Sequence, residues 1–272
     1  MGRACAVIAG SGSFPFHVAR EAKRQGWTVL AVGLQGWADP SLAQHADAYE
    51  EIAVGQLGRL IDCLKAHQVR EAVMAGKVTK GVLFDPKATF DLDTLGLLAR
   101  VKDVSVNSVL GAIADRLAND GITLLDSSAF LKDSLCPVGT LTRRPPTADE
   151  RDDLQAGLRV ARQIAQLDIG QTVVVKRRVI VAVEALEGTD AAITRAGQVA
   201  GAGCVVVKMA SPTQDRRFDL PVLGLRTIEV AASSGVTCLA VEAHATLMLE
   251  QDAVRARADE ANLCIVGVEP AA

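Results

Sequence analysis

Several residue types and patterns are scarce in this 272-residue chain. Aromatic residues make up only 3% and the net charge is −3, so the sequence offers neither a base-stacking platform nor a basic surface for a phosphate backbone. We therefore expect no nucleic-acid partner. No apolar run approaches the roughly 18 residues of a spanning helix, and the chain begins with a strand-like run rather than a secretion signal. These absences favour a soluble, cytoplasmic protein.

Patterns typical of zinc sites, disulfides and thiol catalysis are also missing. The six cysteines never form a Cys-x-x-Cys pair, and four of them lie in apolar, strand-like runs. The four histidines are scattered, without a His-x-x-x-His pair. We interpret the cysteines as buried small hydrophobic residues in a reducing compartment, and the sequence favours neither a zinc site nor a cysteine–histidine catalytic pair.

What the first half contains is an alternation of apolar runs with helical stretches, which is typical of an α/β fold. We expect residues 1–134 to form a Rossmann-like domain, a small parallel sheet flanked by helices. Strands are predicted at 4–9, 28–32, 49–54, 72–75 and 122–125, and helices at 15–25, 57–67 and within 94–119.

The second half begins after a segment rich in proline and glycine, residues 135–146, which we interpret as a linker. Residues 147–272 should form a second, mixed parallel and antiparallel α/β domain. Thr147 and Glu150 match a capping box at the start of a helix. Strands are predicted at 172–175, 179–184, 204–208, 236–240 and 264–268, with a basic hairpin turn at 176–178 and helices at 148–167, 193–200, 227–232 and 246–263.

A glycine loop, residues 10–13, joins the first strand to the first helix. Free backbone amides and the helix dipole favour an anion at such a place. The loop departs from the dinucleotide fingerprint, because Pro15 takes the third glycine position and no acidic residue ends the second strand. A phosphate or nucleotide site other than an NAD site is favoured, and a structural turn is the alternative.

A second glycine ends the strand predicted at 72–75 and is followed at once by a lysine. Gly76 would let a ligand approach the backbone, and Lys77 could neutralise a phosphate. A strand-terminal turn with a solvated lysine explains the same residues.

An acidic turn follows the strand predicted at 179–184. Glu184 closes a buried strand, where packing does not require a carboxylate. Thr189 or Asp190 could cap the next helix, and capping alone would explain these residue types. The alternative is that Glu184 and Asp190, with Asp215 and Asp219, supply the hard oxygen ligands that magnesium prefers.

A charged loop extends from Lys208 to Pro221, directly after the apolar run 204–207. Its prolines forbid a regular helix, and Asp215 and Asp219 stand in it with arginines between them. Carboxylates and cations at the end of a buried strand suit a metal and a phosphate, whereas a solvated loop is the plain alternative.

These segments stand in the same order as in one family. The chain resembles the LpxI-type UDP-2,3-diacylglucosamine pyrophosphatases of lipid A biosynthesis over essentially its whole length. The resemblance implies hydrolysis of the diphosphate of UDP-2,3-diacylglucosamine to UMP and 2,3-diacylglucosamine 1-phosphate (lipid X), with a divalent metal, expected to be Mg²⁺. It also implies two domains with the substrate in the cleft between them, a homodimer, and work at the inner-membrane surface. The resemblance rests on residues 8–12, 75–77, 168–171, 184, 187–190 and 208–221.

The resemblance also assigns roles to residues. Asp219 is expected to be the essential catalytic carboxylate, as metal ligand, water-orienting base or both. Asp215 and Glu184 are expected as further metal ligands, with Asp215 open between ligand and salt-bridge partner. The residues expected to bind substrate are Gly10, Ser11, Gly12, Ser13, Gly76, Lys77, Thr189, Asp190, Lys208, Gln214 and Arg217.

The acyl chains of such a substrate require an apolar groove, which the leucine-rich stretch 82–101 could form, although a core face explains it too. Two other classes of function compete with the hydrolase. One is a non-catalytic nucleotide- or lipid-binding protein, and the other is a nicotinamide-dependent oxidoreductase, which Pro15 disfavours. The apolar residues of the stretch are Leu83, Phe84, Leu92, Leu95, Leu97 and Leu98.

Overall fold

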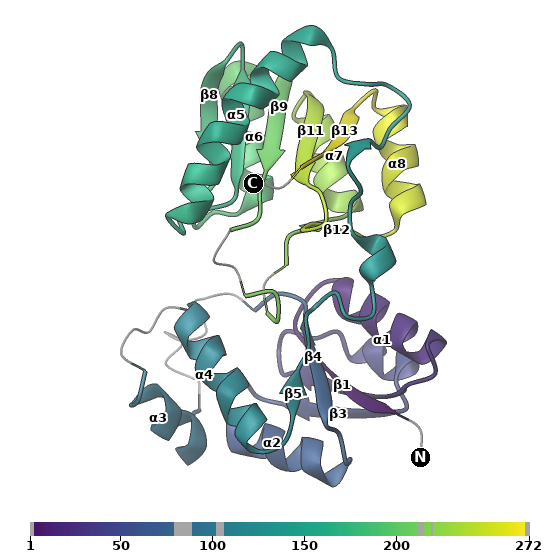
Figure 1. The fold of residues 1–272 in the computed structure, drawn as a ribbon, viewed down its shortest axis with the longest axis vertical. Helices are drawn as coiled ribbons and strands as arrows, with labels where there is room; N and C mark the ends of the chain where they lie inside the picture. Colours follow the sequence, from purple (N-terminus) through teal and green to yellow (C-terminus); the bar gives the residue numbers. More distant parts are fainter. Residues whose placement is uncertain (1–2, 79–88, 102–105, 212–214, 219, 270–272) are drawn as a thin grey trace. The chain divides into compact units, whose positions relative to one another are not determined.

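The structure is a computed structural model that describes residues 3–78, 89–101, 106–211, 215–218 and 220–269, with only the backbone at 106 and 107. The chain divides into two compact units (Figure 1). Both contain strands and helices, so the predicted α/β class is confirmed. The first unit comprises Met1–Lys132 and Asp215–Asp219, and the second comprises Asp133–Gln214 and Leu220–Ala272.

The first unit is built on a five-stranded sheet in the order β3-β2-β1-β4-β5, in which every pairing is parallel. The central strand β1 is apolar along its whole length, as is usual for a parallel sheet that helices cover. All five strands end at one edge, where chemistry is commonly found in α/β proteins. The elements are β1 Ala4–Ala9, α1 Phe14–Arg24, β2 Thr28–Leu34, η1 Pro40–His45, β3 Ala48–Ile52, α2 Leu57–Ala66, β4 Glu71–Ala75, α3 Leu92–Leu98, α4 Val106–Asn119 and β5 Thr123–Leu124.

The second unit has a six-stranded mixed sheet in the order β6-β13-β11-β9-β7-β8, and a small parallel pair of β10 with β12. Strands β9, β11 and β13 are parallel, whereas β7, β8 and β6 run antiparallel to their neighbours, as predicted for a mixed sheet. The elements are η3 Lys132–Ser134, β6 Gly139–Thr140, α5 Ala148–Gln166, β7 Thr172–Lys176, β8 Val179–Val183, α6 Thr189–Ala200, β9 Cys204–Lys208, β10 Val222–Leu223, α7 Leu225–Ser233, β11 Val236–Glu242, β12 Leu247–Met248, α8 Gln251–Glu260 and β13 Cys264–Val268.

Two hydrophobic cores lie on opposite faces of this sheet, because successive side chains of a strand point to opposite faces. Val173 and Val205 pack with residues of α5, while Val174 and Val206 pack with residues of α6, α7 and α8. The unit therefore has three layers, with helices on both faces of the sheet (Figure 1).

The helix predicted over 246–263 is wrong at its start. Leu247 and Met248 form β12, and α8 begins only at Gln251. Both residues are completely buried and pair with β10, while Glu250 has a φ of 52°, which no helix permits. Tertiary pairing here outweighs the local pattern.

The cysteines behave as the sequence suggests. All six are free thiols, five are buried and Cys63 is half-buried. Burial raises the pKa of Cys5 and of Cys136 to about 12, which makes them poor nucleophiles. None of the helices that the structure describes has the length and apolar character needed to cross a membrane.

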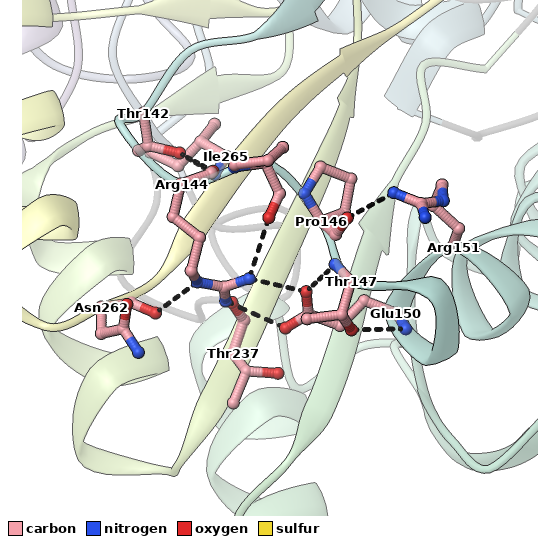
Figure 2. Close-up of polar contacts among 10 residues, drawn as sticks. Thr142, Arg144, Pro146, Thr147, Glu150, Arg151, Thr237, Asn262 and Ile265 are labelled. Atoms are coloured by element: carbon pink, nitrogen blue, oxygen red, sulfur yellow. Dashed lines mark hydrogen bonds and ion pairs between the residues drawn. The ribbon is translucent and has the colours of Figure 1, made fainter.

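Helix α5 starts at the predicted capping box, where Thr147 Oγ1 accepts from the Glu150 amide at 3.2 Å and a Glu150 oxygen accepts from the Thr147 amide at 2.8 Å. The Arg144 guanidinium donates to both Glu150 oxygens, at 2.7 and 2.9 Å, and to the carbonyls of Thr237 and Asn262 (Figure 2). Burial alone would raise the pKa of Glu150, but the bonds from Arg144 and Thr147 outweigh it and lower the pKa. Residues 135–146 thus belong to the second unit.

Replacing Arg144 tests this network, because Arg144→Ala leaves the buried Glu150 carboxylate without its cation. We expect the free energy of unfolding in urea to fall by about 3–5 kcal/mol. Arg143→Ala is the matched control, since the Arg143 side chain is 88% exposed and its pairing with Asp259 should contribute at most about 1 kcal/mol. Because the pKa of Glu150 is lowered, the pair stabilises the fold at neutral pH and the effect should vanish as the pH falls through that pKa. Equal, small losses in the two variants would refute the role of the network.

Candidate active site

The predicted site residues that the structure describes form two groups, one in each unit. The first group contains the glycine loop, Gly76, Lys77, Asp215 and Arg217, and the second contains Glu184, Thr189, Asp190 and Lys208. Asp219 and Gln214 lie outside the described residues.

The glycine loop after β1 pairs with the turn after β4. Ser11 and Lys77 exchange two backbone hydrogen bonds of 2.9 Å, and the Gly10 amide donates to the Ala75 carbonyl at 2.8 Å. A Cβ on Gly10 would lie 2.7 Å from the Lys77 carbonyl oxygen, and Gly76 has a φ of 94° with Gly10 equally close. Both glycines are thus required by the close approach. The amides of Gly10 and Ser11 both donate within this pairing, so they do not remain for a ligand.

The remaining half of the glycine loop faces an open groove of about 410 Å³. Ser13 is the N-cap residue of α1 and its side chain makes no capping bond. The groove therefore combines a helix N-terminus and an arginine, which favour an anion, with aromatic rings that could contact a planar group. Its lining residues are Gly12, Ser13, Phe16, Arg20, Trp37, Ala38 and Asp39.

We call Asp215–Phe218 the strap. The Asp215 carboxylate binds the Arg217 guanidinium through both oxygens, with the shortest distance 2.6 Å, and Oδ1 also accepts from the Arg217 amide. Hydrogen bonding from Arg217 holds the pKa of Asp215 below its usual value. Of the two alternatives left open by the sequence, this geometry favours the salt-bridge partner, and the role of Asp215 as a metal ligand stays a prediction.

The second unit holds a buried polar cluster where β9 ends, the Lys208 cluster, made of Lys208, Thr189, Thr172 and Glu184. The Lys208 ammonium donates to Thr189 Oγ1 at 3.1 Å, and this hydroxyl donates to Glu184 Oε1 at 3.0 Å. Thr172 Oγ1 lies 3.3 Å from the same hydroxyl. Lys208 and Glu184 are only 7% and 6% exposed. No sequence pattern indicates a functional role for Thr172, because threonine is ordinary in a strand.

Glu184 is the buried carboxylate of the Lys208 cluster. Its Oε2 is buried, and no hydrogen-bond partner for it exists among the described residues. A buried carboxylate oxygen without a donor is costly unless a cation or water meets it. In the part of the chain that the structure describes, no three His, Cys, Asp or Glu residues gather as a ready metal cluster.

Thr189 and Asp190 do not cap α6, so that interpretation of the acidic turn is wrong. The N-cap residue is Gly188, whose φ of 85° suits glycine, and no side chain bonds there. The Thr189 hydroxyl is used in the Lys208 cluster instead, and Asp190 pairs with Arg226 at 3.0 Å.

The leucine-rich stretch is only partly described, since Leu83 and Phe84 lie outside the described residues. On α3, Leu92 and Leu95 are 86% and 49% exposed, whereas Leu97 packs against the first core. This helix has one solvent-facing apolar side, so it is not a plain core helix.

The fold and these groups define a two-unit α/β protein whose predicted site residues include one buried lysine, Lys208, and one buried carboxylate, Glu184. Residues 4–134 match the LpxI N-terminal domain and residues 137–266 match the LpxI C-terminal domain. The chain therefore belongs to the LpxI family. It is 30% identical, over 98% of both chains, to the UDP-2,3-diacylglucosamine pyrophosphatase LpxI of Caulobacter vibrioides.

Two solved structures show a distant likeness to this chain. The precorrin-6A reductase CobK matches with a TM-score of 0.33 and 12% identity, over 99% of this chain and 89% of its own. The biotin carboxylase domain of the Hydrogenobacter thermophilus 2-oxoglutarate carboxylase gives 0.29 and 14%, over 64% and 34%. At these scores neither structure bears on the function of this chain.

Two glycine variants test the contact between the loops after β1 and β4. Gly76→Ala places a methyl group 2.7 Å from Gly10 at a φ of 94°. We therefore expect the free energy of unfolding to fall by about 1–3 kcal/mol and the Lys77 amide to exchange hydrogen faster. Gly96→Ala is the matched control, because a Cβ there meets no atom within 4 Å and should stabilise α3 by about 0.5–1 kcal/mol. Unchanged stability and exchange in Gly76→Ala would show that the two loops do not approach so closely.

Proposed function

We propose that this protein hydrolyses the diphosphate of UDP-2,3-diacylglucosamine to UMP and 2,3-diacylglucosamine 1-phosphate (lipid X), a step of lipid A biosynthesis. The observation that carries the proposal is the similarity to the Caulobacter pyrophosphatase across 98% of both chains. The buried lysine, the ordered arginine and the groove at a helix N-terminus support it, since each favours an anionic ligand.

Cationic side chains offset the negative charge that a diphosphate carries, which is the main requirement of phosphoryl transfer. Arg217 and Lys77 provide this charge in the first unit, and Lys208 provides it in the second. Because the Asp215 carboxylate forms a bidentate ion pair with the guanidinium, the Arg217 side chain is oriented before substrate binds. It therefore loses little conformational entropy on binding. Gly12 and Ser13 contact the substrate with backbone amides and a hydroxyl.

Asp219 is the proposed catalytic carboxylate, which orients the attacking water, accepts its proton or holds the metal. It stands next to Phe218 in the sequence, at the end of the strap. Thr189, Asp190 and Gln214 are proposed to contact the substrate.

A divalent cation, Mg²⁺ by the chemistry of its oxygen ligands, is proposed as cofactor. Glu184 and Asp219 would hold it, and the unpartnered Glu184 Oε2 supports that assignment. When bound, such an ion supplies charge stabilisation for the phosphate oxygens. The homodimer and the work at the inner-membrane surface stay predictions.

The decisive experiment is hydrolysis in ¹⁸O-labelled water by the purified protein, with and without a chelator. We expect equal amounts of UMP and lipid X, loss of turnover with the chelator and recovery on adding Mg²⁺. The phosphate that carries the label identifies the phosphorus attacked. Substrate binding without any product would instead identify a non-catalytic binding protein. Unchanged turnover in the presence of the chelator would refute the proposed metal dependence.

Asp219→Ala should lower kcat by about 10²–10⁴-fold, because a positioned general base or metal ligand is lost. Substrate affinity, measured by calorimetry, should change little. Asp62→Ala, at an exposed position of α2, is the control and should keep full turnover. Near-normal turnover in Asp219→Ala would refute the assignment.

A further inference from the structure

The strap is a short segment of the first unit that lies in the sequence between two segments of the second unit. The strands that flank it, β9 and β10, both belong to the second unit, yet Asp215–Asp219 belong to the first. Contacts inside the first unit must therefore hold the strap in place.

Ser127 supplies the most direct of these contacts. Its Oγ lies 3.0 Å from the carbonyl oxygen of Met74 and 3.0 Å from that of Arg217, and its amide donates to the Arg216 carbonyl at 2.8 Å. The residue is 1% exposed. A hydroxyl has a single proton, so this proton is shared between two carbonyls from distant parts of the chain. Loss of the hydroxyl would leave both carbonyls without this donor.

Two neighbouring contacts strengthen the attachment. Asp126 pairs with Arg216 at 2.9 Å, and its other oxygen accepts from the amide and hydroxyl of Ser128, which fixes the carboxylate. Phe218 packs against the hydrophobic core of the first unit, and the Arg217 guanidinium lies 5.2 Å from the centre of its ring.

The place of attachment is the edge where the parallel strands end. Met74 is the penultimate residue of β4, and Ser127 follows β5, the neighbour of β4 in the sheet (Figure 1). Lys77 leaves the end of the same strand β4 and pairs with the glycine loop. Ser127 therefore links the main chain of Arg217 to β4, the strand that Lys77 follows in the sequence.

We propose that Ser127 is a positioning residue for the diphosphatase reaction, which acts by holding the main chain of Arg217 at the end of β4. The proposal rests on the proposed function, because Arg217 matters to turnover only if it meets the phosphates. Ser127 itself touches no substrate. A purely structural serine would change stability and leave kcat unaltered, so the two roles are separable.

Ser127→Ala should lower kcat about 10- to 100-fold with a smaller change in KM, since slight misplacement of an orienting group mainly affects the transition state. The amides of Arg217 and Phe218 should also exchange hydrogen faster. The matched control is Thr142→Ala in the second unit, which likewise removes a hydroxyl bonded to two backbone groups, of Arg144 and Ile265. That variant should keep the wild-type kcat and exchange in the strap.

Asp126→Asn provides a second variant in case Ser127→Ala folds poorly. The amide oxygen can still accept from Ser128, the side chain is 39% exposed, and the variant loses both the charge and the acceptor oxygen that face Arg216. We expect a smaller fall in kcat and faster exchange in the strap, at an unchanged Tm. Wild-type kcat and exchange in both variants would overturn the positioning role alone. An inactive wild-type protein would overturn the proposed function, and the positioning role with it.

Discussion

The first unit depends on the backbone contact between the loops that follow β1 and β4. Two glycines allow it, since a side chain at either Gly10 or Gly76 would collide with the other loop. The contact fixes Lys77 beside the glycine loop and decides which amides of that loop remain for a ligand. The position of Lys77 at this edge of the sheet follows from a steric condition, whereas Arg217 is oriented by its ion pair with Asp215.

Two buried carboxylates in the second unit show how the same residue type can serve different ends. Glu150 is satisfied by Arg144 and the Thr147 amide, and it stabilises the start of α5. Glu184 has one oxygen bonded to Thr189 and the other without a partner among the described residues. Complete pairing suits a carboxylate with a structural role, whereas an incomplete shell suits one that receives a ligand.

Most regular elements could be predicted from the sequence because their apolar periodicity is strong, as in the alternation of Val173 and Val174 between two cores. The capping box at Thr147 was predictable because its partners are three residues apart. The strands β6, β10 and β12 have two residues each and depend on pairing with distant segments, so no local pattern predicts them. The contact of Ser127 with a segment 90 residues away leaves no local pattern for the same reason.

The excursion of the strap makes the first unit discontinuous in sequence. When Lys132 leaves the ribosome, the hydroxyl of Ser127 and the core around Leu117 still lack Arg217 and Phe218, which are synthesised only after β7, β8 and β9. The first unit therefore lacks the contacts with Arg217 and Phe218 while it is still an N-terminal segment, whereas domains commonly fold one after another during synthesis. These contacts can form only after the residues that follow β9 have been synthesised.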